Sequence, residues 1–528
     1  MQFLLSFLGD KKFYYLGLFL VGSGMVVSEV AMSIGTIMLG LNWLFMPNLL
    51  DRINLLKQNK FAHIFIGFYL LHIIGLIYSN DINYGLEELR KKLPIFVFGV
   101  VLSSSEKLNA KNFKIYLYLF LATIFVSSIL SLLAIFGFWN KEILDYRDAS
   151  LFISHIRFSL MICFSLFVAI YYFKSESKTN QIILGSYIIY MLMFLIKLGY
   201  LTGLIIFFAV ILGHILIRFL QSNFIKKSIA VAIIILLIVP PISLIKWYFQ
   251  LEKNYPTKED CQVKSANGEF YINVLSNFEK ENDHFVWVNI ALIELEQNWN
   301  KRSAIPFEGK DKMGNEIKST VLRYLTSKGL NKDSVGVWSL DKTDIEAIEN
   351  GIANHSYLNM NIIEKRFEQI KWEISNYKFD ANPNGHSLTM RFEFWEAGLY
   401  IIKNNWLIGV GSGDVKNAFE KAYEELNSSL NPPNRMRSHN QFIEIGVAFG
   451  LVGIVYFLLL LLYPFREKKN RIDFLYISFF ITVVLSFITE DTLETQAGIT
   501  FYAFFTCFLI FLRQFDKPNS NHQNSSLN

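Results

Sequence analysis

Long apolar runs separated by short polar segments make up most of this 528-residue chain. A helix needs about 20 apolar residues to cross a bilayer, whose core holds no water to satisfy free backbone groups. By that criterion the pattern predicts about twelve spanning helices, and therefore an all-α polytopic membrane protein. The predicted helices begin near Phe13, Val30, Phe61, Leu93, Ile115, Leu151, Ile182, Leu201, Ile229, Phe442, Ile472 and Ala497.

One long polar stretch, residues 249–440, interrupts the apolar pattern between the ninth and tenth predicted helices. At roughly 190 residues it is long enough to hold a small domain. We therefore predict nine helices in residues 1–248, a mostly helical insertion at 249–440, and three helices in 441–513. The polar tail 514–528 lacks the apolar residues needed for packing, so we predict that it is disordered.

Within the insertion, apolar residues recur at alternating steps of four and three over residues 387–403. This spacing predicts an amphipathic helix that lies against the membrane surface. The apolar positions are Leu388, Phe392, Trp395, Leu399 and Ile402.

The distribution of charge predicts the orientation of the chain. The segments predicted to lie inside hold roughly nineteen Lys and Arg residues, whereas the short outer segments hold roughly six, which places both termini in the cytoplasm. The insertion then lies outside. The net charge of +5 is too small to indicate a nucleic-acid partner. The three cysteines are far apart and form neither a disulfide framework nor a zinc motif.

Cations at predicted outer helix ends are candidates for function, because topology disfavours them there. A set of guanidinium groups facing one pocket is suited to a diphosphate, since arginine pairs with phosphate through two hydrogen bonds. Alternatively, these cations extend to lipid headgroups or pair with Glu87 and Glu88. The candidates are Arg90, Lys91, Lys92, Arg157, Lys197, Arg391, Arg435 and Arg437.

Three further features carry candidate chemistry. His439 lies at the start of the tenth predicted helix, and an imidazole with a pKa near 6.5 can accept a proton from a hydroxyl, although a lone histidine is usually structural. Glu490, Asp491 and Glu494 can hold a divalent cation, but we expect a solvated loop because no histidine is close in sequence. The glycines in 409–413 favour a tight, closely packed turn rather than a nucleotide site, because no βαβ unit surrounds them.

Two segments together resemble the O-antigen ligase and O-antigen polymerase superfamily. They read MRFEFWEAGLYIIKNNWLIGVGSGD and RMRSHNQFIEIGVAFGLVG. The resemblance rests on an arginine before an aromatic helix, a Gly-Val-Gly turn, a His-Asn pair that opens a membrane helix, and a Phe-Gly-Leu-x-Gly motif within that helix. Two further segments look like the Bacteroidetes-type branch of the superfamily. They read LHIIGLIYSNDINYGLEELRKKLP and HIRFSL.

This resemblance implies a multi-pass protein of the bacterial inner membrane that needs no metal or other cofactor. The implied reaction is an inverting transfer from an undecaprenyl-diphosphate-linked glycan to a hydroxyl of lipid A-core or of a protein. His439 matches the motif histidine proposed as the base, and Arg391 matches the motif arginine that holds the diphosphate. Arg437, Arg157 and Arg435 are further candidates for binding the diphosphate.

One position departs from the family pattern, because Leu201 stands where the superfamily often has an arginine. Lys197, one turn earlier if the helix continues, is the candidate replacement. The enlarged segment 255–357 is expected to help choose donor or acceptor. The sequence does not distinguish a ligase from a polymerase that joins repeat units. The alternative from another functional class is a flippase or other transporter, which would also have about twelve helices and a path lined with cations for an anionic lipid substrate.

Overall fold

The computed structural model describes residues 8–138, 149–222, 225–229, 231–233, 246, 254–378, 383–467 and 472–514. Their contacts divide the chain into two compact units. Unit 1 joins Met1–Gln221 to Arg391–Asn528, and unit 2 is Ser222–Met390. Residues 391–440 are part of the polar stretch 249–440, but their contacts group them with the apolar helices of unit 1.

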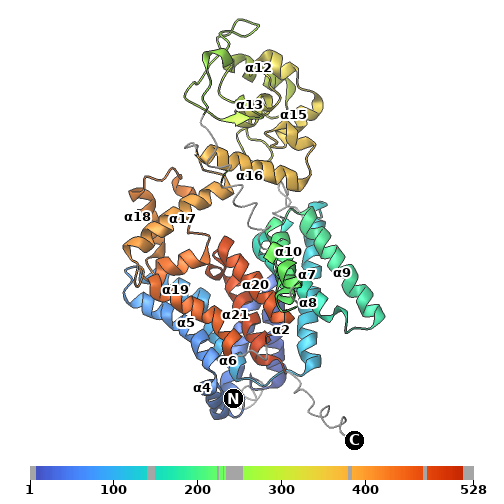
Figure 1. Ribbon diagram of the computed structural model, residues 1–528, viewed down its shortest axis with the longest axis vertical. Helices are drawn as coiled ribbons and strands as arrows, with labels where there is room; N and C mark the ends of the chain where they lie inside the picture. Colours follow the sequence, from blue (N-terminus) through green and yellow to red (C-terminus); the bar gives the residue numbers. More distant parts are fainter. Residues whose placement is uncertain are drawn as a thin grey trace. The chain divides into compact units, whose positions relative to one another are not determined.

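Unit 1 is a bundle of apolar helices (Figure 1). Most of the predicted start positions lie inside or just before one of these helices. The predicted helix near Ile229 and the tail 515–528 fall mainly or wholly outside the described residues. In chain order the main helices are α2 (Lys11–Val27), α3 (Glu29–Phe45), α4 (Leu49–Gln58), α5 (Lys60–Ile77), α6 (Ile82–Ser104), α7 (Ala110–Ile135), α8 (His155–Phe173), α9 (Lys178–Lys197), α10 (Leu201–Leu220), α17 (Ser387–Asn404), α18 (Val415–Glu425), α19 (Gln441–Glu467), α20 (Phe474–Thr489) and α21 (Gln496–Cys507).

Among the described residues, six helices are long and apolar enough to cross a membrane: α5, α7, α8, α9, α10 and α19. The pair α3 and α4, bent by 110°, adds a seventh if it forms one span, and α20 and α21 are apolar but shorter. Unit 1 is thus a mostly helical bundle with several membrane-crossing candidates, and the number twelve stays a prediction.

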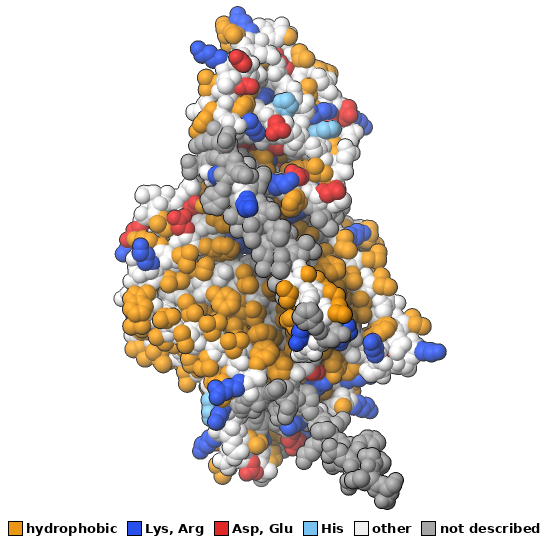
Figure 2. All heavy atoms as spheres, viewed as in Figure 1, with side chains coloured by type: hydrophobic (Ala, Val, Ile, Leu, Met, Phe, Trp, Pro, Cys, Tyr) orange, Lys and Arg blue, Asp and Glu red, His pale blue; other side chains and the backbone are white. Residues whose placement is uncertain are grey.

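The centre of unit 1 lies along α8 and α21. Every residue from Phe158 to Ala169 is buried, as is every residue from Ala497 to Cys507. By contrast, α9 and α10 expose large apolar side chains such as Ile182, Met193 and Ile205. Figure 2 shows a broad band of hydrophobic side chains over the helices of unit 1. A hydrophobic surface of this extent is unfavourable in water and is suited to contact with lipid.

A break in α19 explains two of the sequence motifs. Gly450 has φ 58°, which interrupts the helix and leaves the groups around it without helical partners. The glycine turn supplies the partners, because Val410 and Gly411 donate to the carbonyls of Val447 and Ala448. A Cβ at Gly409 would stand 2.4 Å from the backbone of Ala448. The prediction of a tight, closely packed turn is confirmed.

The same turn is fixed to the junction between α5 and α6. Asp414 accepts hydrogen bonds from the backbone N–H groups of Asn80 and Asp81, at 2.8 and 2.9 Å. Gly413 donates to Ser79 Oγ. These bonds hold the loop before α18 in place, and with it the end of α17.

Unit 2 is a small helical domain with one two-stranded antiparallel ribbon. Its core contains Trp299, Phe307, Tyr324 and Leu325, all fully buried or nearly so. Its elements are η2 (Lys258–Asp260), β1 (Lys280–Glu281), β2 (His284–Phe285), α12 (Leu292–Arg302), α13 (Ile317–Ser327), α14 (Ser334–Trp338), α15 (Lys342–Glu349), η3 (His355–Leu358) and α16 (Ile362–Lys378).

Candidate functional site

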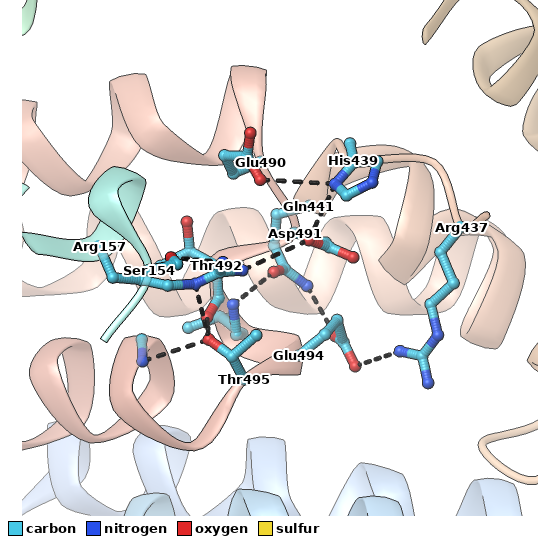
Figure 3. A network of polar contacts seen from close by, with 12 residues as sticks. Ser154, Arg157, Arg437, His439, Gln441, Glu490, Asp491, Thr492, Glu494 and Thr495 are labelled. Atoms are coloured by element: carbon cyan, nitrogen blue, oxygen red, sulfur yellow. Dashed lines mark hydrogen bonds and ion pairs between the residues drawn. The ribbon is translucent and has the colours of Figure 1, made fainter. Parts of the chain in front are cut away.

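A short acidic turn between α20 and α21 gathers several of the predicted residues (Figure 3). Glu490 and Asp491 precede η6 (Thr492–Glu494), a 3-10 helix of one turn, and Glu494 ends it. Thr495 then caps α21 by accepting from the N–H of Gly498. The short spacing and the helix cap hold three carboxylates together at one end of the bundle.

Glu490 joins the two motif residues. Its Oε1 accepts a hydrogen bond of 2.7 Å from Arg391 Nη2, and its Oε2 lies 3.4 Å from His439 Nδ1. The Glu490 side chain is only 4% exposed, so water screens these interactions weakly. One buried carboxylate therefore fixes residues from α17 and from the loop before α19.

Asp491 extends this group to α8. Its Oδ1 lies 3.5 Å from His439 Nδ1 and 3.9 Å from Arg157 Nη2. Arg157 also donates to Thr495 Oγ1 at 3.1 Å and to Ser154 Oγ at 3.0 Å. The guanidinium at the start of α8 is thus oriented by the same turn that holds the imidazole.

Glu494 holds a second pair of cations. It accepts 2.9 Å and 2.7 Å hydrogen bonds from Arg437 Nη1 and Lys92 Nζ. Glu88 accepts from Arg437, Lys92 and Lys91. The alternative that outer cations pair with Glu87 and Glu88 is confirmed for Lys91 and Lys92, which both pair with Glu88.

The backbone at His439 explains why the His-Asn pair opens α19. Asn440 Oδ1 accepts from the N–H groups of Phe442 and Ile443, which satisfies donors at the first turn. His439 has φ 46°, a conformation that costs a non-glycine residue free energy. This strain is tolerated where the surrounding contacts fix the position of the imidazole.

The carboxylates change the protonation of His439. Burial disfavours its charged form, but Asp491 and Glu490 outweigh burial and raise the pKa of His439 to about 9. Burial likewise opposes the charge of Asp491, yet the hydrogen bond and charge of His439 keep the pKa of Asp491 below its usual value. This pKa lies above the ordinary imidazole value of about 6.5, so the charged form of His439 predominates at neutral pH.

The expectation of a solvated acidic loop is also wrong. Glu490 and Asp491 are 3% and 7% exposed, and a histidine that is distant in sequence lies between them. Single ligand atoms of His439, Glu490 and Asp491 lie within 4.8 Å of one another, so these three side chains can hold a metal ion. The absence of a metal from the reaction remains a prediction that needs measurement.

Two predicted cations lie outside this group. Lys197 is exposed and stands 5.3 Å from the centre of the Phe136 ring. It ends α9, and Gly199, with φ 65°, separates it from Leu201 at the start of α10. The helix does not continue between them, so the geometric reason for Lys197 as a replacement is lost. Arg435 donates to the carbonyl of Leu430.

Sequence reasoning missed the roles of Glu490, Asp491 and Glu494 as partners of these cations. One feature of the sequence could have indicated this role. The three carboxylates lie in a predicted outer loop, on the side of the membrane where the candidate cations are also predicted. Nothing in their spacing specifies Arg391 or Arg157, which lie in distant segments of the chain.

Comparison with known proteins gives two findings. The family profile described as O-antigen ligase matches residues 351–458, which include α17, the glycine turn, His439 and the first part of α19. An uncharacterized protein of Haemophilus influenzae is 29% identical over 159 residues, or 28% of this chain. The matched region spans 40% of the length of that relative.

Proposed function

We propose that this chain is a membrane glycosyltransferase of the ligase type, and the match of residues 351–458 to the O-antigen ligase profile supports this proposal. Its donor is a glycan on an undecaprenyl-diphosphate carrier, and its acceptor is a hydroxyl of lipid A-core or of a protein. The reaction inverts the anomeric carbon and uses no metal.

The observation that carries this proposal is the shared contact of Arg391 and His439 with Glu490. The two groups lie together although the chain between them includes two helices and the glycine turn. One offers a charged donor for phosphate oxygens, and the other offers a proton-transfer group.

The chemistry follows from these positions. The acceptor oxygen attacks the anomeric carbon and the bond from that carbon to the diphosphate oxygen breaks, while the hydroxyl proton passes to His439. Nδ1 of His439 faces the two carboxylates, so in the neutral imidazole Nδ1 carries the proton and Nε2 takes the proton of the hydroxyl. With a pKa of about 9, only a minor fraction of His439 is in this neutral form at pH 7. Arg391, Arg157 and Arg437 stabilise the negative charge that develops on the departing diphosphate.

The proposed location is the bacterial inner membrane, with both termini in the cytoplasm and unit 2 outside. Labelling of Lys301→Cys, an exposed position of α12, with a membrane-impermeant thiol reagent tests this orientation in whole cells. Cys261 supplies a thiol in the same unit, so the label is measured against a Cys261→Ser background. Protection of Lys301→Cys until the inner membrane is opened would contradict the orientation.

Glycan transfer in a strain that lacks the protein tests the function. The strain is complemented with wild type, His439→Ala or Arg391→Ala at matched expression, and lipopolysaccharide ladders and glycoprotein mobility are compared. A transferase predicts loss of transfer and accumulation of lipid-linked donor outside the inner membrane with both variants. Accumulation of the donor inside the cytoplasm would support a transporter, and loss of chain extension alone would support a polymerase.

A further inference from the structure

A cavity of about 500 Å³ lies between α8, α10 and α20 in unit 1. It is distinct from the acidic turn, because it opens at the other end of α8. Arg157 and Lys174 are seventeen positions apart, which corresponds to about 25 Å along a helix.

Two helices supply matching faces of the cavity. On each, four lining residues are spaced at i, i+3, i+4 and i+7, so they lie on one side of the helix. In both helices the last of the four is a cation near the C-terminal end. The lining residues are Phe167, Ile170, Tyr171 and Lys174 from the α8 side, Ile211, His214, Ile215 and Arg218 from α10, and Phe474 from α20.

The acidic residues close to this cavity in sequence already have partners. Glu176 is paired with Lys114 and accepts from Asn180, and Asp473 is paired with Arg513. Within the described part of the chain, no carboxylate forms an ion pair with Lys174 or Arg218. Both cations also complement the negative C-terminal ends of their helices, an interaction that leaves their charge available to an anion.

The remaining wall is apolar or internally satisfied. His214 Nε2 is 2.9 Å from Ser478 Oγ, and its ring stacks on Phe474 with centroids 4.3 Å apart. Phe167, Ile170 and Ile211 offer no polar groups. The cavity therefore combines an apolar wall with two cations at one end, which is the chemistry of a lipid with an anionic head.

We propose that this cavity binds an anionic glycerophospholipid, with its phosphate between Lys174 and Arg218 and an acyl chain along the apolar wall. The volume falls in the range of about 300–1,000 Å³ that is usual for ligand pockets, so it holds the headgroup region and the upper part of a chain. Both cations lie in segments predicted to face the cytoplasm, and basic pockets between membrane helices on that side recognise anionic lipids. This inference goes beyond glycan transfer and does not depend on it.

Native mass spectrometry of the purified full-length chain tests the proposal, with phosphatidylglycerol, phosphatidylethanolamine and inorganic phosphate as separate probes. The double variant Lys174→Gln/Arg218→Gln is expected to bind phosphatidylglycerol about 25-fold more weakly, at roughly fivefold for each cation near an anionic lipid. The matched control Lys111→Gln/Lys178→Gln removes two exposed cations outside the cavity and is expected to bind as wild type does.

A second variant tests the cavity without changing its charge. Ile211→Trp fills the apolar wall and is expected to reduce phosphatidylglycerol binding while both cations remain. Equal binding by the double variant and its control would overturn the proposal. So would equal affinity for phosphatidylethanolamine, which would indicate an unselective apolar groove, or for inorganic phosphate, which would indicate a site for the free ion.

Discussion

Buried ion pairs are arranged differently in the two units. In unit 2, Glu281 accepts from Arg323 and Asn354, and Asp344 accepts from Lys328 and Tyr324 beside the hydrophobic core. These carboxylates are well satisfied by neighbouring side chains. Their arrangement is that expected of contacts that hold a small domain together.

The ion pairs of unit 1 instead share carboxylates between distant segments of the chain, as Glu490 does for Arg391 and His439. Asp491 lies near both His439 and Arg157, and Glu494 pairs with Arg437 and Lys92. The cluster of unit 1 therefore holds residues from several distant segments together at one end of the bundle, whereas each pair of unit 2 links neighbouring parts of a small domain.

The largest expected effect is the loss of transfer in variants of the motif residues. His439→Ala is expected to lower kcat/KM by about 10²–10⁴-fold, because that is the usual contribution of a positioned base. Arg391→Lys keeps the charge but loses the planar fork, so its effect should be smaller than that of Arg391→Ala. Rates are measured with purified protein, donor and acceptor.

Lys197→Ala and Arg435→Ala serve as matched controls, because both residues lie outside the cluster. Each should leave transfer close to the wild-type rate. A loss as large as that of Arg391→Ala in either control would break the assignment of function to the acidic turn and its partners.

The next effect is on the stability of unit 2. Arg323→Ala leaves Glu281 buried without its charged partner and should cost about 3–5 kcal/mol. Thermal unfolding of the full-length protein, followed by tryptophan fluorescence, measures the change, since Arg323 stacks on Trp372 at 4.1 Å. An unchanged unfolding temperature would show that this pair does not stabilise unit 2.

A smaller effect concerns the dependence of the rate on pH. If neutral His439 is the base, kcat/KM should rise as pH increases and level off near pH 9, where the raised pKa lies. Asp491→Asn removes a nearby negative charge, lowers the pKa of His439, and should move this rise to lower pH. The maximum rate should also fall, because the imidazole loses part of its orientation.

Glu494→Gln is the control for this shift, because Glu494 contacts Arg437 and Lys92. It should leave the position of the rise unchanged. A rate that falls between pH 7 and pH 9 in the wild type would mean that the charged imidazolium is the active form, and the base would have to be another group.

The smallest expected effect is that of metal removal. If the arginines and not a metal stabilise the departing diphosphate, a chelator should leave transfer unchanged. The measurement is the rate before and after treatment with a chelator, followed by addition of Mg²⁺ or Mn²⁺. Loss of activity that the metal restores would contradict the metal-free mechanism, and His439, Glu490 and Asp491 would be the first candidate ligands.

The helices of unit 1 could be predicted because an apolar run of the required length is a local property of the sequence. Arg391 and His439 could also be selected, since each lies in a short motif. Their partners could not, because Glu490 and Asp491 are far away in sequence and look like a solvated loop in isolation. Burial and pairing, which set the pKa of His439, arise only when α8, α17 and α20 come together.

The most direct test is transfer by the purified protein in lipid nanodiscs, supplied with an undecaprenyl-diphosphate-linked glycan and a hydroxyl acceptor. The measured quantities are the glycosylated acceptor and the released lipid diphosphate. Our account predicts that wild type forms both in equal amounts, and that Arg391→Ala and His439→Ala form neither while their fold is retained. Equal product formation by wild type and both variants would contradict the account.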